Sequence, residues 1–528
     1  MARDRDSAFF GHPLGLATLF FTEMWERFSY YGMRAFLLLF IIAPVAEGGR
    51  GMSPITAGSV MAVFGASVYL LSLPGGWIAD RFIGQRKAVT IGGIGIALGN
   101  GMLAYPDERL FYPGLALIAA GTGLLKPNVS TIVGQLYKPD DIRRDSGFTI
   151  YYMGINIGAT AAPLVCGFLA QSTTFRNFLL EKEIDPNMCW KFAFGAAAVG
   201  MVGGLIQYTL GQSWLGEAGK KPTIPSDPAR AARDRMVLGI VAGALAGIFA
   251  LVVVFEPSKD VIVNVMGIGL VLGSIALFVG LYMSAHDARE KRGIIAMIPL
   301  FLGAIGFFGI FEQAPTTLSI YAEDLTRREF LGLTIPASYY QSVNGFFIVL
   351  LAPAFAYLWV RLARAKKEPS SVAKFAIGMV VLAFSFVIML PATDASKLGT
   401  DPGPVSAGFL IGLYFFYTIA ELCISPVGLS SMSKLAPKRL AGMVMGTWFL
   451  GTAIGIYLAG RATTISENNG FGFLFVFLII ASLVMAAALF VVAPIIKRMR
   501  AADDAAGPAM SEAPAVVDLP PARIVKDD

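Results

Sequence analysis

The stretch TEMWERFSYYGMR at residues 22–34 places four charges inside a segment otherwise apolar enough to cross a membrane. The runs ATLFF and AFLLLFIIAP flank it, and its charged residues are Glu23, Glu26, Arg27 and Arg34. A charge near the bilayer centre costs about 2.5–3.5 kcal/mol, so it is kept where it pairs or works. At 3.6 residues per turn, one helix face carries a polar set: Glu23, Arg27, Tyr30, Tyr31 and Arg34. This face is expected to line a polar cavity; a helix end with snorkelling charges is the alternative for Glu23.

The composition is that of an integral membrane protein. The chain has 528 residues, of which 55% are hydrophobic and only 15% are charged, whereas soluble domains carry about 25% charged residues. Its net charge of +6 arises from basic residues in short loops, which predicts no nucleic-acid partner. Three scattered cysteines are too few for a disulfide framework or a metal cluster, so no metal or other cofactor is expected.

Apolar runs of about 20 residues recur along the chain and predict membrane-spanning helices. Fourteen are expected, at 15–42, 55–79, 88–105, 111–134, 146–171, 191–211, 236–255, 262–284, 295–322, 337–361, 373–391, 405–431, 441–460 and 470–497. Because the number is even, both termini are predicted on one side. Roughly 29 basic residues fall in the loops and termini of that side and roughly 10 on the other, which predicts cytoplasmic termini.

A Gly-, Pro- and charge-rich linker at 212–235 divides the chain, and the helices at 236–255 and 262–284 are almost wholly aliphatic. Without that pair, six helices lie on each side of the division, as in a two-bundle transporter with its binding site between the halves. The predicted fold is therefore an all-α polytopic protein. Its parts are a six-helix bundle (1–211), a cytoplasmic linker (212–235), an inserted helix pair (236–284), a second six-helix bundle (285–500) and a disordered cytoplasmic tail (501–528).

Three further charges lie inside apolar spans: Lys126 in GTGLLKPNVS, Glu312 in GFFGIFEQAPT and Glu421 in TIAELCISPVGLS. Pro127 and Pro426 are expected to bend the helices that carry the first and the last of these. A lysine in the middle of a membrane-spanning helix costs free energy that a purely structural role does not readily offset. The two glutamates have the alternative of serving only as helix–helix clasps.

The seven intramembrane charges sum to four negative and three positive. If all face one cavity, an unpaired carboxylate is expected to take up one proton. Pairs between the bundles, such as Arg34 with Glu312 or Lys126 with Glu421, would latch the halves and be broken by protonation. The sequence does not decide which pairs form.

Neutral side chains complete the predicted cavity. They are the hydroxyls of Tyr30, Tyr31 and Tyr69, the amides of Asn156 and Asn344, and the aromatic rings of Phe308 and Trp448. Each of these, taken alone, is better explained by packing, except that packing and ligand binding explain Trp448 equally well. A separate stretch, GGWIADRFIGQRK at 75–87, is expected to stabilise one conformation through Gly76, Asp80 and Arg81 without binding substrate.

These residues resemble the proton-dependent oligopeptide transporter family of the major facilitator superfamily. The motifs that carry the resemblance are EMWERFSYYG, GTGLLKPNVS, FTIYYMGINIG, GIFEQ, ELCISPVGLS and GMVMGTWFL, in the family's order. They cover essentially the whole chain except the tail, and GGWIADRFIGQRK resembles the wider superfamily's loop motif.

The resemblance implies symport of di- and tripeptides with protons into the cell across the inner membrane, with no enzymatic activity and no required oligomer. Glu23, Glu26 and Arg27 match the family's proton-coupling motif, and Glu312 matches a carboxylate that pairs across the bundles. Arg34 and Lys126 match residues that hold the peptide carboxylate. The residues that match those holding the amino group are Asn156, Asn344 and Glu421.

Two departures from the family pattern affect details. Phe308 stands where the family often has tryptophan, which implies a reshaped side-chain pocket. Gly345 stands where proline often follows the asparagine, which implies a softer hinge. The two histidines, His12 and His286, lie at membrane edges, so carboxylates are expected to carry the proton.

The sequence leaves two alternative functions open, namely transport of another substrate and a function other than transport. The same fold would also suit nitrate, an amino acid or a peptidomimetic drug, although cations together with Glu421 favour a zwitterion. A polytopic enzyme or receptor is the other class, but the spans show no nucleophile with its base and no metal set. The expected partners are therefore a short peptide, protons and membrane lipid.

Overall fold

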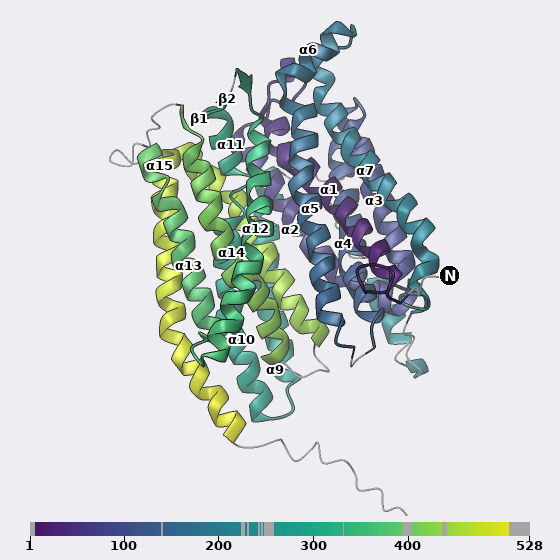
Figure 1. Cartoon of the computed structure of the whole chain (residues 1–528), viewed down its shortest axis with the longest axis vertical. Coiled ribbons are helices and arrows are strands. Elements are labelled where there is room, and N and C mark those ends of the chain that lie inside the picture. Colours follow the sequence, from purple (N-terminus) through teal and green to yellow (C-terminus); the bar gives the residue numbers. More distant parts are fainter. Residues whose placement is uncertain are drawn as a thin grey trace, which may run out of the picture.

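The computed structural model describes residues 6–138, 141–222, 227–229, 232–240, 243, 247, 258–330, 332–393, 404–435 and 441–505. Its first half is a bundle of long helices, beside which the second half stands (Figure 1). The helices of the first half are α1 (Leu14–Ile42), α2 (Pro54–Ile78), α3 (Gln85–Ala104), α4 (Phe111–Gln135), α5 (Arg144–Gln171), the short α6 (Thr173–Glu181) and α7 (Cys189–Gly211).

The second half repeats this arrangement after an additional helix, α9 (Lys259–Met283). Its own helices are α10 (Ala288–Phe311), α11 (Thr317–Asp324), α12 (Tyr340–Arg364), α13 (Ser371–Val387), α14 (Gly408–Leu435) and α15 (Ala441–Ala505). Short strands outside the helices pair β1 (Thr326–Arg327) with β4 (Val405–Ser406) and β2 (Glu329–Phe330) with β3 (Leu333–Thr334).

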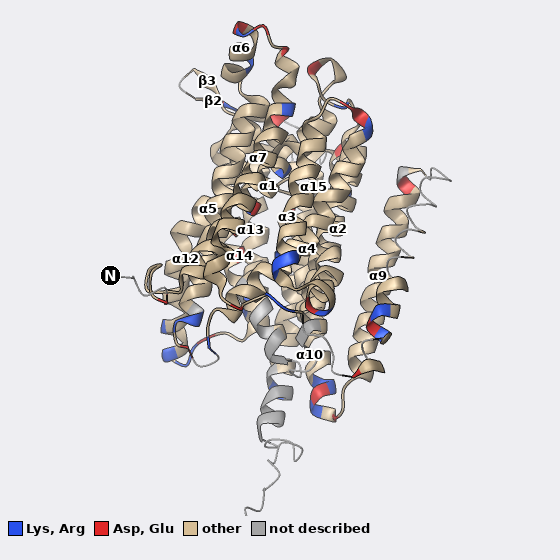
Figure 2. Ribbon diagram, turned by 90° about the vertical axis from the view of Figure 1, so that its right-hand side faces the viewer, with Lys and Arg blue, Asp and Glu red and all other residues tan. Residues whose placement is uncertain are grey.

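The described helices have the length and composition of membrane spans. Eleven helical segments are long and apolar enough to cross a bilayer, and the last of them, Met443–Ile496, contains two spans. Helix α1 is absent from those eleven because every 18-residue stretch of it holds at least three charges. Lysine, arginine, aspartate and glutamate gather at the two ends of the bundle, as expected for a chain that crosses a membrane (Figure 2).

Most predicted helices are confirmed within a few residues, and two are corrected. The run at 295–322 is two helices, because α10 ends at Phe311 and α11 begins at Thr317, with Pro315 in the break. Proline lacks the N–H that a continuous helix needs and clashes with the preceding turn. The runs at 441–460 and 470–497 extend toward each other, so that the chain turns at Gly470, where φ is 79°.

Other predictions fall partly or wholly outside the described residues. The predicted helix at 236–255 lies mostly outside them. Residues 501–505 continue α15, and the rest of the predicted tail at 501–528 lies outside them. The beginning of the predicted linker, by contrast, is packed against the first half: Arg86 donates to the carbonyls of Gly216 at 2.6 Å and Ala218 at 2.7 Å.

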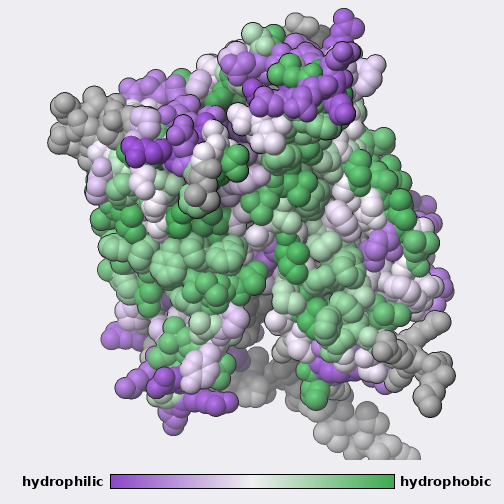
Figure 3. All heavy atoms as spheres, turned by 45° about the horizontal axis from the view of Figure 1, so that its top comes forward, coloured by the Kyte–Doolittle hydropathy of each residue, from purple (hydrophilic) through white to green (hydrophobic). Residues whose placement is uncertain are grey.

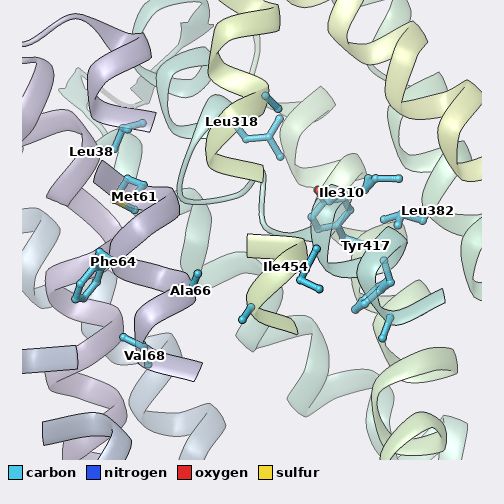
Figure 4. Packing of buried hydrophobic residues seen from close by; sticks show 14 of the residues in the cluster. Leu38, Met61, Phe64, Ala66, Val68, Ile310, Leu318, Leu382, Tyr417 and Ile454 are labelled. Atoms are coloured by element: carbon cyan, nitrogen blue, oxygen red, sulfur yellow. The ribbon is translucent and has the colours of Figure 1, made fainter. Parts of the chain in front are cut away.

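The two halves meet along two seams. On one, α2 packs against α15, where Gly58 and Gly460 allow the backbones to approach closely. On the other, α5 meets α12, where Ser342 donates to the carbonyl of Thr160 at 2.8 Å. A hydrophobic cluster extends through both halves, and its members from each are seen in Figure 4, where Phe64 and Tyr417 are labelled.

The α5–α12 seam is tight toward the end of the bundle opposite residues 6–12. Gln171 accepts from the Ser338 backbone N–H at 3.1 Å, and Gln341 donates to the carbonyl of Ala35 at 3.0 Å. The contacts made by α5 lie from Thr160 onward, and Ala35 belongs to α1. In the space-filling view a groove runs between the described parts of the two halves toward their lower ends (Figure 3). The α5–α12 seam is therefore tight toward one end, whereas the α2–α15 seam keeps contact toward the other end, where a Cβ on Gly446 would lie 3.1 Å from the Leu73 side chain.

The segment before α1 is attached to the loop between α4 and α5. The buried ring of His12 lies with Nδ1 3.0 Å from the Tyr137 hydroxyl and Nε2 3.4 Å from the Ser146 hydroxyl. Arg143 donates to the carboxylates of Asp6 at 3.0 Å and Asp141 at 2.8 Å. Burial, together with the nearby Arg143 charge, lowers the pKa of His12.

Candidate functional site

The charged face of α1 holds a compact buried network. Arg27 donates to one oxygen of Glu23 through Nε at 2.8 Å and Nη2 at 2.6 Å. The hydroxyl of Tyr151, on α5, donates to the other Glu23 oxygen at 2.6 Å. Because the arginine and glutamate are four residues apart, they lie on one helix face, as predicted. The network joins α1 to α5 within the first half.

Glu26 belongs to the same network but has fewer partners. Its carboxylate is fully buried, and Oε2 lies 3.2 Å from Nε of Arg27. Neither oxygen accepts a hydrogen bond from the part of the chain that the structure describes. Lys126, on α4, acts on it electrostatically. A buried carboxylate with so few donors is costly as an anion, which makes it a candidate proton acceptor.

One ion pair crosses between the halves. Arg34, on α1, pairs with Glu312, and both side chains are only 8% exposed. Glu312 stands directly after α10, and the break at Pro315 directs the chain away from α10 beside this carboxylate. The pair expected between Arg34 and Glu312 is thus present. The break that positions it was not predicted.

Lys126 has no carboxylate partner among the described residues. Its ammonium lies 3.8 Å from the centre of the Tyr69 ring, on α2. Such a contact between a cation and an aromatic face is worth about 0.5–2 kcal/mol, less than a hydrogen-bonded buried ion pair. The pair considered between Lys126 and Glu421 is not formed in this conformation. This lysine therefore keeps ammonium protons free for a ligand.

Glu421, on α14, is held by neutral donors. Asn344, on α12, donates to its Oε2 at 3.1 Å and to the Thr418 hydroxyl at 3.1 Å. Tyr152, on α5 in the other half, acts on Glu421 electrostatically. Asn156 also lies on α5 and donates to the carbonyl of Tyr152 at 2.9 Å. The predicted amide residues are thus on facing helices, but they are not hydrogen-bonded to each other.

The predicted aromatic residues form two groups. Phe308 and Trp448 meet edge to face with ring centres 5.8 Å apart, inside the second half. Tyr30 and Tyr31 meet in the same way at 5.4 Å in the first half. The Tyr30 hydroxyl is buried and has no hydrogen-bond partner within the described residues.

The loop motif between α2 and α3 forms a local structure at the end of the bundle. Gly76 lies directly against Pro127 of α4, and the Asp80 carboxylate accepts from the Gln85 amide at 2.6 Å. Arg81 lies 3.6 Å from a carboxylate oxygen of Asp234, beyond the end of α7. Residues Ala79–Ile83 form a π-helical turn that presents these side chains. Pro426 lies within α14, but its side chain is outside the described part.

Tyr151 and Tyr152 are the two residues that the sequence analysis missed. Both belong to the stretch FTIYYMGINIG, and only Asn156 was selected from it. Consecutive helical residues are about 100° apart, so these neighbours face different partners: Tyr151 contacts Glu23, and Tyr152 lies toward Glu421. A pair of tyrosines within an apolar span was the available signal.

Gly345 lies at the seam between the two halves, and its expected effect on a hinge stays a prediction. A Cβ at this position would lie 2.4 Å from the Thr160 hydroxyl oxygen of α5. The glycine therefore permits the close approach of α12 to α5 at the seam. No larger side chain fits there without movement of the helices.

Two helical bundles with intramembrane charges at their junction define a membrane transporter of the major facilitator type. The family model described as POT family matches residues 59–473 of this chain. The chain therefore belongs to the POT family.

Several relatives and solved structures are similar over most of their length. Peptide transporter YePEPT of Yersinia enterocolitica is 37% identical, covering 86% of this chain and 88% of the relative. A di-/tripeptide transporter of Lactococcus lactis is 36% identical, covering 84% and 88%. A crystal structure of the peptide transporter POT in complex with sulfate has a TM-score of 0.83 at 38% identity, covering 93% and 96%. A POT family transporter in complex with 5-aminolevulinic acid has a TM-score of 0.83 at 33% identity, covering 93% and 98%.

Proposed function

We propose that this protein is a symporter that carries di- and tripeptides into the cell with protons. The observation that carries the proposal is the ion pair between Arg34 and Glu312, which joins the two halves beside cations and carboxylates with few partners. The names of the relatives that are peptide or di-/tripeptide transporters support the cargo.

The peptide's two charged ends are assigned to opposite halves. Lys126 and Arg34, in the first half, bind the carboxylate, and Glu421 with Asn344, in the second, binds the amino group. Asn156 and the three tyrosines Tyr30, Tyr31 and Tyr69 supply further polar contacts. Phe308 and Trp448 line a side-chain pocket. A fixed distance between the two charged groups selects peptide length.

Protons act on the carboxylates of the first half and on the cross-bundle pair. Glu26 accepts a proton within the network of Glu23 and Arg27, and Glu312 accepts one when its pair with Arg34 opens. A protonated Glu312 no longer holds Arg34 as an anion does, so the halves separate where the α5–α12 seam is tight and the arginine becomes available to the peptide carboxylate. Gly76, Asp80, Arg81, Pro127 and Pro426 stabilise or bend the moving helices.

We assign the protein to the inner membrane, with both termini in the cytoplasm. The distribution of basic loops supports this orientation. Helix α9, which contacts α2, α10 and α15 from outside, belongs to a peripheral inserted pair at 236–284. Neither a resident cofactor nor an oligomer is needed for this mechanism.

The deciding experiment is uptake of labelled dialanine into proteoliposomes containing the full chain. We expect accumulation when the outside is acid and only equilibration without a pH gradient. Accumulation that does not depend on the pH gradient would exclude protons as the coupling ion. Absence of any uptake or exchange would exclude peptides as the substrate.

Another small zwitterion is the second candidate cargo. A POT family structure holds 5-aminolevulinic acid, whose amino and carboxyl groups are separated by as many chain atoms as those of a dipeptide, without the peptide N–H. Competition of this compound and of free alanine with labelled dialanine separates the two cargoes. Stronger competition by dialanine itself is the expected outcome.

A further inference from the structure

A polar cavity lies within the first half, at the end opposite residues 6–12. Its volume is about 200 Å³, and it lies between the loop after α1, the loop between α3 and α4, and the start of α7. Two cations, Arg50 and Lys191, line it together with the aromatic rings of Phe40 and Phe111 and with two acidic residues, Glu108 and Asp107, of which Asp107 accepts from the Arg109 backbone N–H at 2.9 Å. It is separate from the charges at the junction of the halves, which all lie in other parts of their helices.

Arg50 makes unusually few contacts for a buried cation. Its side chain is 13% exposed, yet its guanidinium donates no hydrogen bond to any described residue, and Nε is fully enclosed. The guanidinium stacks on Phe111, with its central carbon 4.4 Å from the ring centre. Glu108 is the nearest carboxylate, at 3.9 Å, but its own side chain is 81% exposed and hydrated. A buried Nε–H donor without an acceptor is costly, and an anion in the cavity would supply that acceptor.

Lys191 adds a second cation without a carboxylate partner in the described chain. Its ammonium reaches only the backbone carbonyls of Leu103 and Tyr105, both at 3.4 Å, and lies 5.4 Å from the centre of the Phe40 ring. Like charges facing one small cavity repel each other, so an anion between them would relieve repulsion from both sides.

The loop that carries Arg50 is fixed by backbone hydrogen bonds. The N–H of Arg50 donates to the carbonyl of Phe40 at 3.1 Å, and that of Gly51 donates to Ala43 at 2.8 Å. The guanidinium is thus held by a folded loop and by the Phe111 ring. The cavity is formed before any ligand binds.

We infer that this cavity binds a phosphate group through Arg50 and Lys191. A guanidinium offers paired N–H donors that match two phosphate oxygens, and an ammonium supplies a second charge. The cavity lies where membrane spans end, and the adjacent Tyr105 and Tyr112 are 62% and 46% exposed, as is common for aromatic residues at the membrane interface. Two sources present this chemistry there: the headgroup of an anionic phospholipid and inorganic phosphate.

The test measures thermal unfolding of the full-length protein in neutral detergent with three additives at constant ionic strength. They are phosphatidylglycerol, inorganic phosphate, and diacylglycerol as a lipid without phosphate. A ligand that binds only the folded protein raises the unfolding midpoint with its concentration. A rise with phosphatidylglycerol alone identifies the lipid headgroup, and a rise with inorganic phosphate identifies the free ion. An equal rise with diacylglycerol, or no rise with either phosphate compound, overturns the inference.

Variants locate the site. The double variant Arg50→Ala/Lys191→Ala should raise the apparent Kd for the stabilising phosphate compound at least tenfold. Glu108→Gln should lower this Kd a few-fold, because it removes a competing carboxylate. Arg109→Ala is the matched control, because this exposed arginine of the same loop does not line the cavity. An equal loss of phosphate-dependent stabilisation in Arg109→Ala would refute the assignment. Unchanged binding both in the double variant and in Glu108→Gln would also refute it. If the double variant does not fold, Lys191→Gln and Glu108→Gln must move the apparent Kd in opposite directions.

Discussion

Replacing Glu312 with glutamine tests the ion pair that joins the halves. Removing one partner of a buried ion pair costs about 3–5 kcal/mol, because the other charge stays buried. Glutamine still offers Arg34 a carbonyl acceptor, and a hydrogen bond to a charged group is worth about 1.5–3 kcal/mol. Both side chains are only 8% exposed, so solvent does not weaken this ion pair as it weakens pairs on a protein surface. The net loss is therefore about 2 kcal/mol, roughly a 30-fold shift away from the described conformation.

The assay compares two modes of dialanine transport in proteoliposomes. Glu312→Gln should abolish accumulation driven by a pH gradient, because the proton site is lost, while exchange at equal pH persists. In an Arg34→Gln background, the same change should shift the conformational equilibrium little further, since the pair is already broken. Glu329→Gln is the control, as this exposed carboxylate on β2 makes the same chemical change outside the bundle. Gradient-driven accumulation at the normal level in Glu312→Gln would refute the reasoning.

Four further outcomes are expected. Glu26→Gln should lose gradient-driven accumulation and keep exchange, because its buried carboxylate accepts no hydrogen bond from the described residues and is the candidate proton acceptor; accumulation at the normal level contradicts this. Lys126→Ala should reduce dialanine uptake at least tenfold, whereas Lys138→Ala, an exposed lysine beyond α4, should leave it unchanged. Deleting 236–284 with a suitable linker should spare uptake, and complete loss in a folded variant would show that the pair is not peripheral. Burial lowers the pKa of His12, so packing of the segment at residues 6–12 favours the neutral ring, and the segment should detach as the pH falls below about 6.5. Hydrogen exchange of this segment should then become faster, and His12→Gln should remove the pH dependence.

The helices were predictable because each depends on a property of its own residues. A run of about 20 apolar residues must form a helix in lipid, so the spans at 15–42 and 55–79 agree closely with α1 and α2. The break between α10 and α11 was not predicted because the apolar residues before and after it together have the length of one span, although Pro315 between them was an available signal. The short helix α6 was missed because it lies outside the spans, at an end of the bundle.

The site residues were predictable where lipid makes a residue type expensive. A charge in a span must be paired or functional, and this singled out Arg34, Glu312 and Lys126. Their partners depend on packing between helices far apart in the sequence, which no local pattern specifies. The sequence therefore did not predict Tyr151 as the hydrogen-bond donor to Glu23. It suggested an ion pair between Lys126 and Glu421, whereas the Lys126 ammonium lies over the Tyr69 ring.

The arrangement of these charges bears on how peptide and proton are coupled. The network of Glu23, Glu26 and Arg27 carries one excess negative charge, which is offset by Lys126 nearby. Under the proposed mechanism, the peptide carboxylate neutralises this lysine, and Glu26 is then a buried anion without its counter-charge. Such a group is stabilised by taking up a proton, so binding of peptide and proton favour each other reciprocally. Dialanine affinity should therefore rise as pH falls in the wild type, while Glu26→Gln should bind with an affinity that no longer depends on pH. A pH dependence of unchanged slope in that variant would place the coupled proton on another carboxylate.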